Sequence, residues 1–304
     1  MAASQPKTSG LKASHMDIAL RLNKEMLVLS SPIEAGLERL DIDVAHDLSI
    51  ANVLEPETIK TAIEPYVMGG VQCLVANTKG MLQANLAHEN LDSRARDIAQ
   101  AALSIAKKCK PQHVIVELGN CGLPLDSQSK NSLNEYKNQY VSAARIFEAQ
   151  DGFDAYFLSG LENTTQIKCA LMGLRQASDK PVIVSVEVDS QGKLNGKEDI
   201  YDYAQVLVEF GATIAGIEVK DDLATAEKLI KRLRAGCDLP LLVEFFVGDK
   251  GSTYDNSDSM KEAAIIANKC GAQFLRATGN GRPAHAAVLA GTSSQMPLNI
   301  KIGV

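Results

Sequence analysis

Eight short apolar segments alternate with helical patterns from residue 26 onwards, and this alternation limits the possible folds more than any other feature. The segments are almost continuously apolar, which is typical of parallel strands covered on both faces. They span residues 26–30, 71–78, 113–119, 154–160, 181–188, 213–219, 240–248 and 272–278. Eight strands with intervening helices in 304 residues predict an α/β fold, the (β/α)8 TIM barrel, rather than an open doubly wound sheet. No GxGxxG follows the first segment, which weakens a dinucleotide-binding interpretation.

Apolar residues spaced three and four apart predict the helices between these strands. The stripes are Leu91, Ala95, Ile98, Ala102 and Ile105; Ile167, Leu171 and Leu174; and Leu223, Ala226, Ile230 and Leu233. Asp222 stands before the third stripe, where an N-cap side chain is expected. A further helix is expected over residues 57–68, and Pro65 should bend or shorten it.

We expect a single barrel domain over residues 17–292, because no linker-like change of composition interrupts this range. Residues 1–16 are polar and lack an apolar core, so we expect a disordered leader or tag rather than a secretory signal. Residues 293–304 are expected to form a C-terminal tail, and the polar stretch 248–259 a surface loop.

The composition argues against nucleic-acid and membrane partners. The formal net charge is −6, whereas nucleic acids and anionic membranes favour a basic surface. No apolar run reaches the roughly 20 residues that a membrane span needs. The six cysteines form no CxxC or CxxH pair, so we expect small buried apolar residues. We therefore expect a cytoplasmic protein.

Polar residues collect where the predicted strands end, and a barrel of this kind carries its active site at the C-terminal strand ends. Four glutamates lie inside otherwise apolar segments, where a buried carboxylate is costly unless it is paired or ligated. We predict Glu218 and Lys220 as catalytic residues, with a partner for one of them within about 4 Å. The predicted substrate-binding residues are Asn77, Lys79, Glu117, Cys121, Glu187, Glu244 and Arg276.

These residues allow three interpretations. The carboxylates pair with lysine or arginine as scaffolding inside the barrel, or they form an acidic cup for a cationic substrate or a hard metal ion. In the third interpretation, Lys220 or Lys79 forms a Schiff base. The segment 278–283 is either an anion site with Arg276 or Arg282, or a plain turn from strand to helix.

The order of several segments resembles the homocysteine S-methyltransferase family, the zinc-dependent barrel of methionine synthases and betaine–homocysteine methyltransferases. "LEPETIKTAIEPYVMGGVQCLVANTKG" (54–80) is similar to that family's helix, its "AGAD" turn and its "TNTFG" strand end. "VELGNCG" resembles the "GPxG" loop, "GFDAYFLSG" the "GVDLILIET" strand, and "PVIVSVEVDSQGKLNG" the strand and loop that follow. "GIEVKDD" (216–222) stands at the family's "GLNC", and "LRATGNGRPAH" (275–285) at its "GGCCGTTPxH". The resemblance covers residues 26–290 and implies the barrel fold.

The resemblance also implies that the family's site residues are replaced. Its three zinc thiolates correspond to Val219, Thr278 and Gly279, none of which offers a thiolate. The aspartate and glutamate that hold the amino acid correspond to Ser30 and Ser159.

We therefore expect a methyl-transfer lineage with a changed substrate and no thiolate-bound zinc, with no further cofactor assigned. A non-catalytic ligand- or partner-binding barrel and a lysine-dependent lyase or aldolase stay open as alternatives. The expected ligand is a small molecule at the barrel mouth, and a separate corrinoid or folate-linked protein stays open as a partner.

Overall fold

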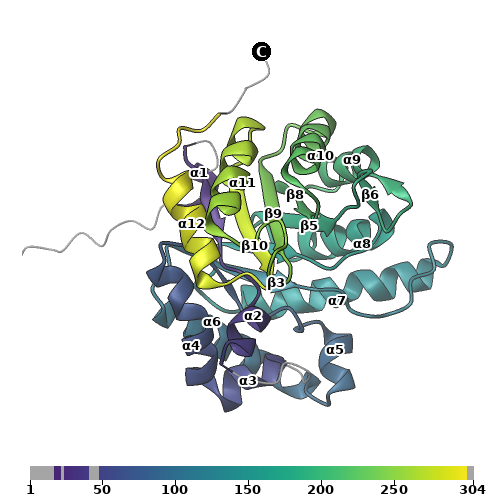
Figure 1. Ribbon diagram of the computed structural model, residues 1–304. Helices are drawn as coiled ribbons and strands as arrows, with labels where there is room; N and C mark the ends of the chain where they lie inside the picture. The colour runs from purple at the N-terminus through teal and green to yellow at the C-terminus, as the bar shows by residue number, and fades with distance from the viewer. Residues whose placement is uncertain (1–16, 22–23, 41–47, 300–304) are drawn as a thin grey trace, which may run out of the picture.

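Eight parallel strands close into a barrel in the computed structural model, which describes residues 17–21, 24–40 and 48–299 (Figure 1). Around the barrel the strand order is β1, β10, β9, β8, β5, β4, β3 and β2. These strands are β1 (Leu27–Leu29), β2 (Cys73–Ala76), β3 (His113–Leu118), β4 (Ala155–Leu158), β5 (Val182–Glu187), β8 (Ile214–Val219), β9 (Leu241–Val247) and β10 (Phe274–Gly279). The predicted (β/α)8 barrel is confirmed.

Helices surround the barrel (Figure 1). In chain order they are α1 (Ile18–Arg21), α2 (Ile33–Glu38), α3 (Leu48–Leu54), α4 (Pro56–Met68), α5 (Gln83–His88), the 3-10 helix η1 (Asp92–Arg94), α6 (Ala95–Lys108), α7 (Lys130–Glu148), α8 (Thr164–Arg175), α9 (Ile200–Glu209), α10 (Leu223–Gly236), α11 (Ser257–Lys269) and α12 (Pro283–Ser293). Within the described residues, none of these helices has the length and apolar character needed to cross a bilayer.

The predicted stripe of α8 is confirmed as a buried face, and those of α6 and α10 are confirmed except at their first residues. Leu91 precedes α6 and is partly buried, and Leu223 at the start of α10 is also partly buried. Asp222 caps α10 as predicted, because its Oδ1 accepts a hydrogen bond from the Thr225 amide at 2.8 Å. The expected shortening at Pro65 is not observed: α4 continues to Met68, and the Gly69 amide donates to the Pro65 carbonyl at 3.0 Å. Pro65 lies three residues before the end of α4, so only a short part of the helix follows the backbone hydrogen bond that a proline cannot donate.

Two apolar layers on either side of the strands explain why the strands are almost continuously apolar. Residues at alternate positions point into the barrel and form its interior. The outward-facing residues pack against the helices in a larger cluster. The interior cluster contains Leu27, Leu29, Cys73, Val75, Ile115, Ala155, Phe157, Ile183, Ile214, Leu242 and Phe274. These side chains fill the N-terminal part of the barrel, so the C-terminal strand ends are left to polar residues.

Three connecting segments complete the structure. Strands β6 (Lys193–Leu194) and β7 (Glu198–Asp199) form a hairpin between β5 and α9. Its turn contains Asn195 and Gly196, both with positive φ, as tight hairpins require. The predicted surface loop 248–259 is anchored by the fully buried Tyr254, and its last residues begin α11. Asn268 Nδ2 donates to the Pro297 carbonyl at 3.0 Å, so residues after α12 pack on α11. The predicted leader 1–16 and residues 300–304 lie outside the described residues.

Candidate active site at the barrel mouth

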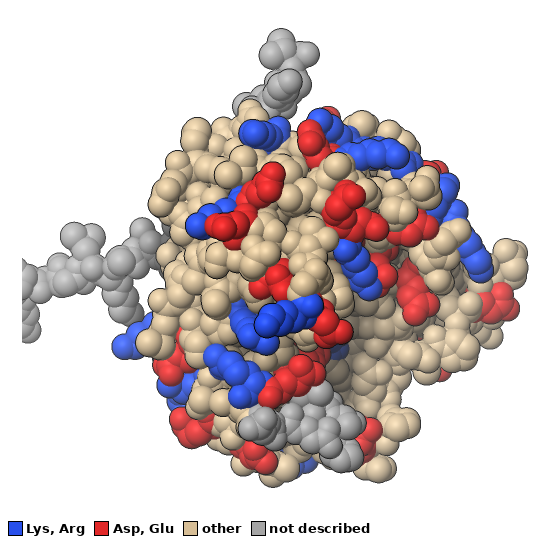
Figure 2. Space-filling model, in the orientation of Figure 1, with Lys and Arg blue, Asp and Glu red and all other residues tan. Residues whose placement is uncertain are grey.

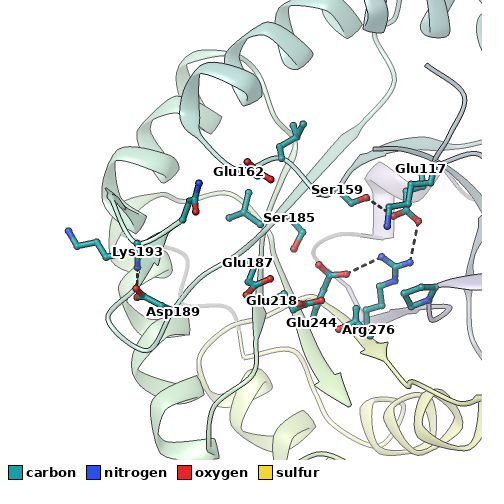
Figure 3. Close-up of a pocket in the computed structure, with 18 residues that line it drawn as sticks. Glu117, Ser159, Glu162, Ser185, Glu187, Asp189, Lys193, Glu218, Glu244 and Arg276 are labelled. Atoms are coloured by element: carbon teal, nitrogen blue, oxygen red, sulfur yellow. Dashed lines mark hydrogen bonds and ion pairs between the residues drawn. The ribbon is translucent and has the colours of Figure 1, made fainter. Parts of the chain in front are cut away.

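One register position carries charged residues across four neighbouring strands. Glu187 of β5 lies beside Glu218 of β8, Glu218 beside Glu244 of β9, and Glu244 beside Arg276 of β10. Adjacent strands are about 5 Å apart, so these side chains leave the barrel wall as close neighbours. The charged row (Glu187, Glu218, Glu244 and Arg276) lines the pocket drawn in Figure 3. Leu242 and Phe274 of the apolar interior stand two residues before Glu244 and Arg276, on the same faces of β9 and β10.

Arg276 pairs with two buried carboxylates within the barrel. Its Nη1 donates to Glu244 Oε1 at 3.0 Å, its Nη2 to Glu117 Oε2 at 3.3 Å, and its Nε to the Ser30 carbonyl at 2.9 Å. The guanidinium also lies over the Phe157 ring, 4.9 Å from the ring centre. The side chain of Arg276 is only 2% exposed. It needs these partners, because burying an unpaired charge costs roughly several kcal/mol.

Glu117 is held in its ionised form by the groups around it. Burial opposes the charge, but the positive charges of Arg276 and Lys79 and the Ser159 hydroxyl outweigh burial and lower the pKa of Glu117. Ser159 Oγ donates to Glu117 Oε1 at 2.6 Å, and the Glu117 amide donates to Thr78 Oγ1 at 2.9 Å. The carboxylate is therefore held by Ser159, directly after β4, and by Arg276 of β10, while the backbone amide of Glu117 is bonded to Thr78 after β2.

The predicted partner within about 4 Å of Glu218 or Lys220 is confirmed. Lys220 Nζ lies 2.8 Å from Glu187 Oε2 and 3.8 Å from Glu218 Oε1. Lys220 is 40% exposed and its ammonium lies 4.8 Å from the centre of the Phe246 ring, so the pair with Glu187 is at the rim. Glu218 is 20% exposed. Burial and the neighbouring Glu244 carboxylate raise the pKa of Glu218, against the Thr278 hydroxyl and Lys220.

A cavity of about 530 Å³ opens above the charged row. That volume is in the range of small-molecule sites. The β6–β7 hairpin contributes one side through Lys193, Asn195 and Gly196. Further lining residues are Pro32, Lys79, Glu117, Ser159, Gly160, Leu161, Glu162, Ser185, Val186, Glu187, Asp189, Glu218, Glu244, Arg276 and Thr278. Lysine, arginine and acidic residues are interspersed over the face of the molecule shown in Figure 2, without one continuous basic patch.

The structure brings most of the predicted residues to this cavity, but not all of them. Asn77 faces a second cavity of about 430 Å³, where it donates to the Leu48 carbonyl at 2.7 Å and joins β2 to α3. Lys79 lines both cavities. Cys121 is buried in the outer apolar cluster and lines neither cavity, and burial raises the pKa of its thiol. A loop position alone gave no way to predict that Cys121 points away from the mouth.

Two serines of the cavity, Ser159 and Ser185, were not among the predicted site residues. Ser185 interrupts the apolar run of β5 two residues before Glu187, on the same face of the strand. A small polar residue at such an inward position is the signal that could have identified it. Arg276 donates to two carboxylates, and the Gly281 amide donates to the Thr278 carbonyl at 3.0 Å, so segment 278–283 forms a turn.

The positions matched to the zinc thiolates do not form a thiolate site. Val219 is buried in the outer apolar cluster, Thr278 lines the cavity, and Gly279 has a φ of 57°. All six cysteines are buried and free. Among residues 17–21, 24–40 and 48–299, no group of three or more His, Cys, Asp or Glu side chains could hold a metal ion. The described donor set therefore does not fit thiolate-bound zinc.

The closed parallel barrel and its charged mouth define an α/β-barrel protein with a candidate active site at the C-terminal strand ends. The family model of homocysteine S-methyltransferase matches residues 25–278. The chain belongs to the homocysteine S-methyltransferase family.

Individual relatives are distant. The chain is 23% identical over 232 residues to methionine synthase of Mycobacterium leprae, an alignment that covers 70% of this chain. The chain spans only about a fifth of that relative, since the alignment covers 19% of its length. The structure is similar to the metallated form of the Escherichia coli homocysteine methyltransferase MmuM, with a TM-score of 0.71 and 20% identity over 91% of this chain and 99% of that chain. For the oxidized form of MmuM the TM-score is 0.74, with 18% identity over 88% and 96% of the two chains.

Proposed function

We propose that this protein is a methyl-transfer enzyme that acts on a substrate other than homocysteine and does so without thiolate-bound zinc. Family membership supports the methyl-transfer lineage, and the relatives are named methionine synthase and homocysteine methyltransferase. The charged row carries the change of substrate, because three carboxylates and an arginine occupy one layer of the mouth.

Ser30 and Ser159, the positions matched to the family's two amino-acid-binding carboxylates, make hydrogen bonds within the protein. Ser30 Oγ accepts a hydrogen bond from the Val75 amide at 2.9 Å. Ser159 Oγ donates to Glu117 at 2.6 Å. A hydroxyl also lacks the charge with which a carboxylate would pair with an ammonium group. These contacts support a substrate that is held in a different way from homocysteine.

Glu218 is the group best placed to handle a proton in such a reaction. The base takes a proton from the acceptor, the freed lone pair bonds to the methyl carbon, and the methyl–donor bond breaks with its electron pair leaving on the donor. A raised carboxyl pKa brings a glutamate closer to the operating range of a general base. Burial and Glu244 provide that shift for Glu218, and the cavity gives its carboxylate access to a ligand.

A transfer experiment tests this proposal. Purified protein is incubated with 13C-methyl donors of four classes, namely a sulfonium, a trimethylammonium, methyltetrahydrofolate and methylcobalamin. The last two also test a separate folate-linked or corrinoid protein as the donor partner. Each donor is combined with amine and thiol acceptors, and NMR follows the label. We expect transfer to a non-homocysteine acceptor that Glu218→Gln reduces by about 100-fold. Equal transfer by both proteins would contradict the role of Glu218.

A non-catalytic ligand-binding barrel is the second candidate. It is supported by the Glu117–Arg276–Glu244 network, in which both buried carboxylates already pair with the guanidinium. Binding of a ligand in the cavity without label transfer from any of the four donor classes would favour this candidate.

The structure gives little support to the lysine-dependent lyase. A Schiff-base lysine is activated by desolvation or by a nearby cation. Lys220 is instead 40% exposed and paired with Glu187. Borohydride reduction in the presence of a carbonyl compound should therefore modify Lys220 no faster than the other exposed lysines, as peptide mass spectrometry would show.

A further inference from the structure

The middle glutamate of the charged row has no cation of its own. Arg276 contacts Glu244 at 3.0 Å, and Lys220 contacts Glu187 at 2.8 Å. Glu218, between them, shares Lys220 only at 3.8 Å. Like charges on adjacent strands repel one another, so Glu218 carries the least compensated negative charge of the row.

A hydroxyl without a partner lies one layer below Glu218. Ser185 is 2% exposed, and its Oγ is buried without a hydrogen-bond partner among the described residues. Ser185 pairs in register with Gly216, two residues before Glu218 on the same face of β8. Figure 3 shows its side chain between those of Ser159 and Glu244. A buried hydroxyl left unpaired costs free energy, so this group is suited to receive a ligand's hydrogen bond.

The charge of the cavity favours a cation over an anion. Six of its described lining residues are acidic, namely Glu117, Glu162, Glu187, Asp189, Glu218 and Glu244. Only three are basic, and each already pairs with a carboxylate: Lys79 with Glu34 at 3.9 Å, Lys193 with Asp199, and Arg276 with Glu117 and Glu244 of the same cavity. A ligand carboxylate would therefore meet excess negative charge without a free cation.

The kind of cation follows from the groups that are left. A hard metal ion takes six or more oxygen ligands, whereas Glu218 is the one carboxylate of the charged row without a close cation. A quaternary ammonium is held by aromatic faces, yet no described lining residue is aromatic. Phe157 and Phe246 lie near, but Arg276 and Lys220 cover them. Glu218 and Ser185 instead offer oxygen acceptors, which suit N–H donors.

We infer that the cavity binds a small primary amine as its ammonium ion, with N–H donors to Glu218 and Ser185 and with no carboxylate on the ligand. This inference deepens the proposed function, because it names the class of acceptor in methyl transfer. Its test measures binding alone, so absence of transfer and absence of binding remain distinguishable.

The test compares three ligands that differ in the presence of N–H donors and of a carboxylate. Butylamine, 4-aminobutyrate and butyltrimethylammonium are titrated into the protein at about pH 8, where carboxylates are ionised, and NMR or calorimetry measures Kd. Butylamine is expected to bind with a Kd of about 1–10 mM, as its few atoms allow. The other two should bind at least about tenfold more weakly, because one adds a carboxylate and the other lacks N–H donors.

Three variants locate the binding site. Glu218→Gln removes the charge without changing the shape and should weaken butylamine by at least about tenfold. Ser185→Ala should weaken it by about threefold to tenfold. Glu262→Gln is the matched control, since Glu262 is an exposed glutamate of α11 that does not line this cavity, and should leave Kd unchanged. Circular dichroism confirms that each variant is folded.

Three results would overturn the inference. They are no binding of butylamine up to about 50 mM, equal or tighter binding of 4-aminobutyrate, and equal weakening by Glu262→Gln and Glu218→Gln. The last result would indicate general attraction to an acidic surface rather than a defined site.

Discussion

Arg276 is the residue that allows two glutamates to stand inside this barrel. It contacts Glu117 and Glu244 from a position that is almost wholly buried. Such a network adds little stability over an apolar core, but removing one member leaves unpaired buried charges. The network therefore both pairs buried charges and lines the cavity. For this reason the sequence alone could not distinguish a structural role of these residues from a functional one.

Replacing Arg276 should destabilise the fold strongly. Arg276→Met leaves Glu117 and Glu244 buried without their cation, so the free energy of unfolding at pH 7 should fall by about 3–5 kcal/mol. The pKa of Glu117 is lowered in the folded protein, so its stabilisation is present above the ordinary carboxyl pKa and is lost as pH falls through the lowered pKa.

In the variant both carboxylates can take up protons in acid, so the deficit should shrink as pH falls. Urea unfolding across the pH range measures this. Arg96→Met, at an exposed position of α6, is the control and should change stability by at most about 0.5 kcal/mol. A loss that does not vary with pH would contradict the charge argument.

Glu218→Gln should have the opposite effect on stability. Burial and Glu244 raise the pKa of Glu218, so its ionised form opposes folding at neutral pH, with Glu187, Lys220 and Thr278 as its other neighbours. The variant should therefore be more stable than the parent above the raised pKa. This advantage should disappear as pH falls to the ordinary glutamate pKa, because Glu218 is then protonated in both states. Thermal unfolding of the parent and the variant at several pH values measures this difference in stability. A variant that is less stable at every pH would refute the claim that ionised Glu218 opposes folding.

At the scale of elements, the close pairing of β5 and β8 positions the charged row. Gly216 faces Ser185, and a Cβ built at Gly216 would lie 2.8 Å from the Ser185 Cβ and Oγ and 2.9 Å from the Val184 carbonyl. The absence of a side chain at Gly216 lets β5 and β8 meet in register. The hairpin β6–β7 then closes one side of the cavity.

Two glycine substitutions test this pairing. Gly216→Ala should destabilise the protein by about 1–3 kcal/mol, because backbone and side chain of β5 would have to move. Gly291→Ala in α12 meets nothing within 4 Å, so it should stabilise the protein by about 0.5–1 kcal/mol through helix propensity. Urea unfolding compares the two. Similar small effects at both positions would show that the β5–β8 contact is not tight.

At the scale of the whole molecule, apolar periodicity was enough to predict the barrel. Long apolar runs such as 181–188 can be strands of a parallel sheet, and eight of them leave few alternatives. The residues in the mouth were also predictable in part, because glutamates inside apolar runs must find partners.

The partners themselves could not be predicted, because they come from distant strands. Arg276 reaches Glu117 across 159 positions of sequence, and the register that aligns Glu187, Glu218 and Glu244 depends on strand pairing. Cys121 was predicted to line the mouth because it follows a strand in the sequence. Its side chain instead packs in the outer apolar cluster. Whether the matched Val219, Thr278 and Gly279 mark a changed chemistry stays a proposal.

The most direct test of the central claim is methionine formation from homocysteine. Purified protein is supplied with zinc, homocysteine and each of the four methyl-donor classes, with an active homocysteine methyltransferase as the positive control. We predict no appreciable methionine from this protein, because the His, Cys, Asp and Glu residues that the structure describes form no metal-binding group to activate the thiol, and serines stand at positions 30 and 159. Turnover at about 1 per second or faster would contradict the proposed change of substrate.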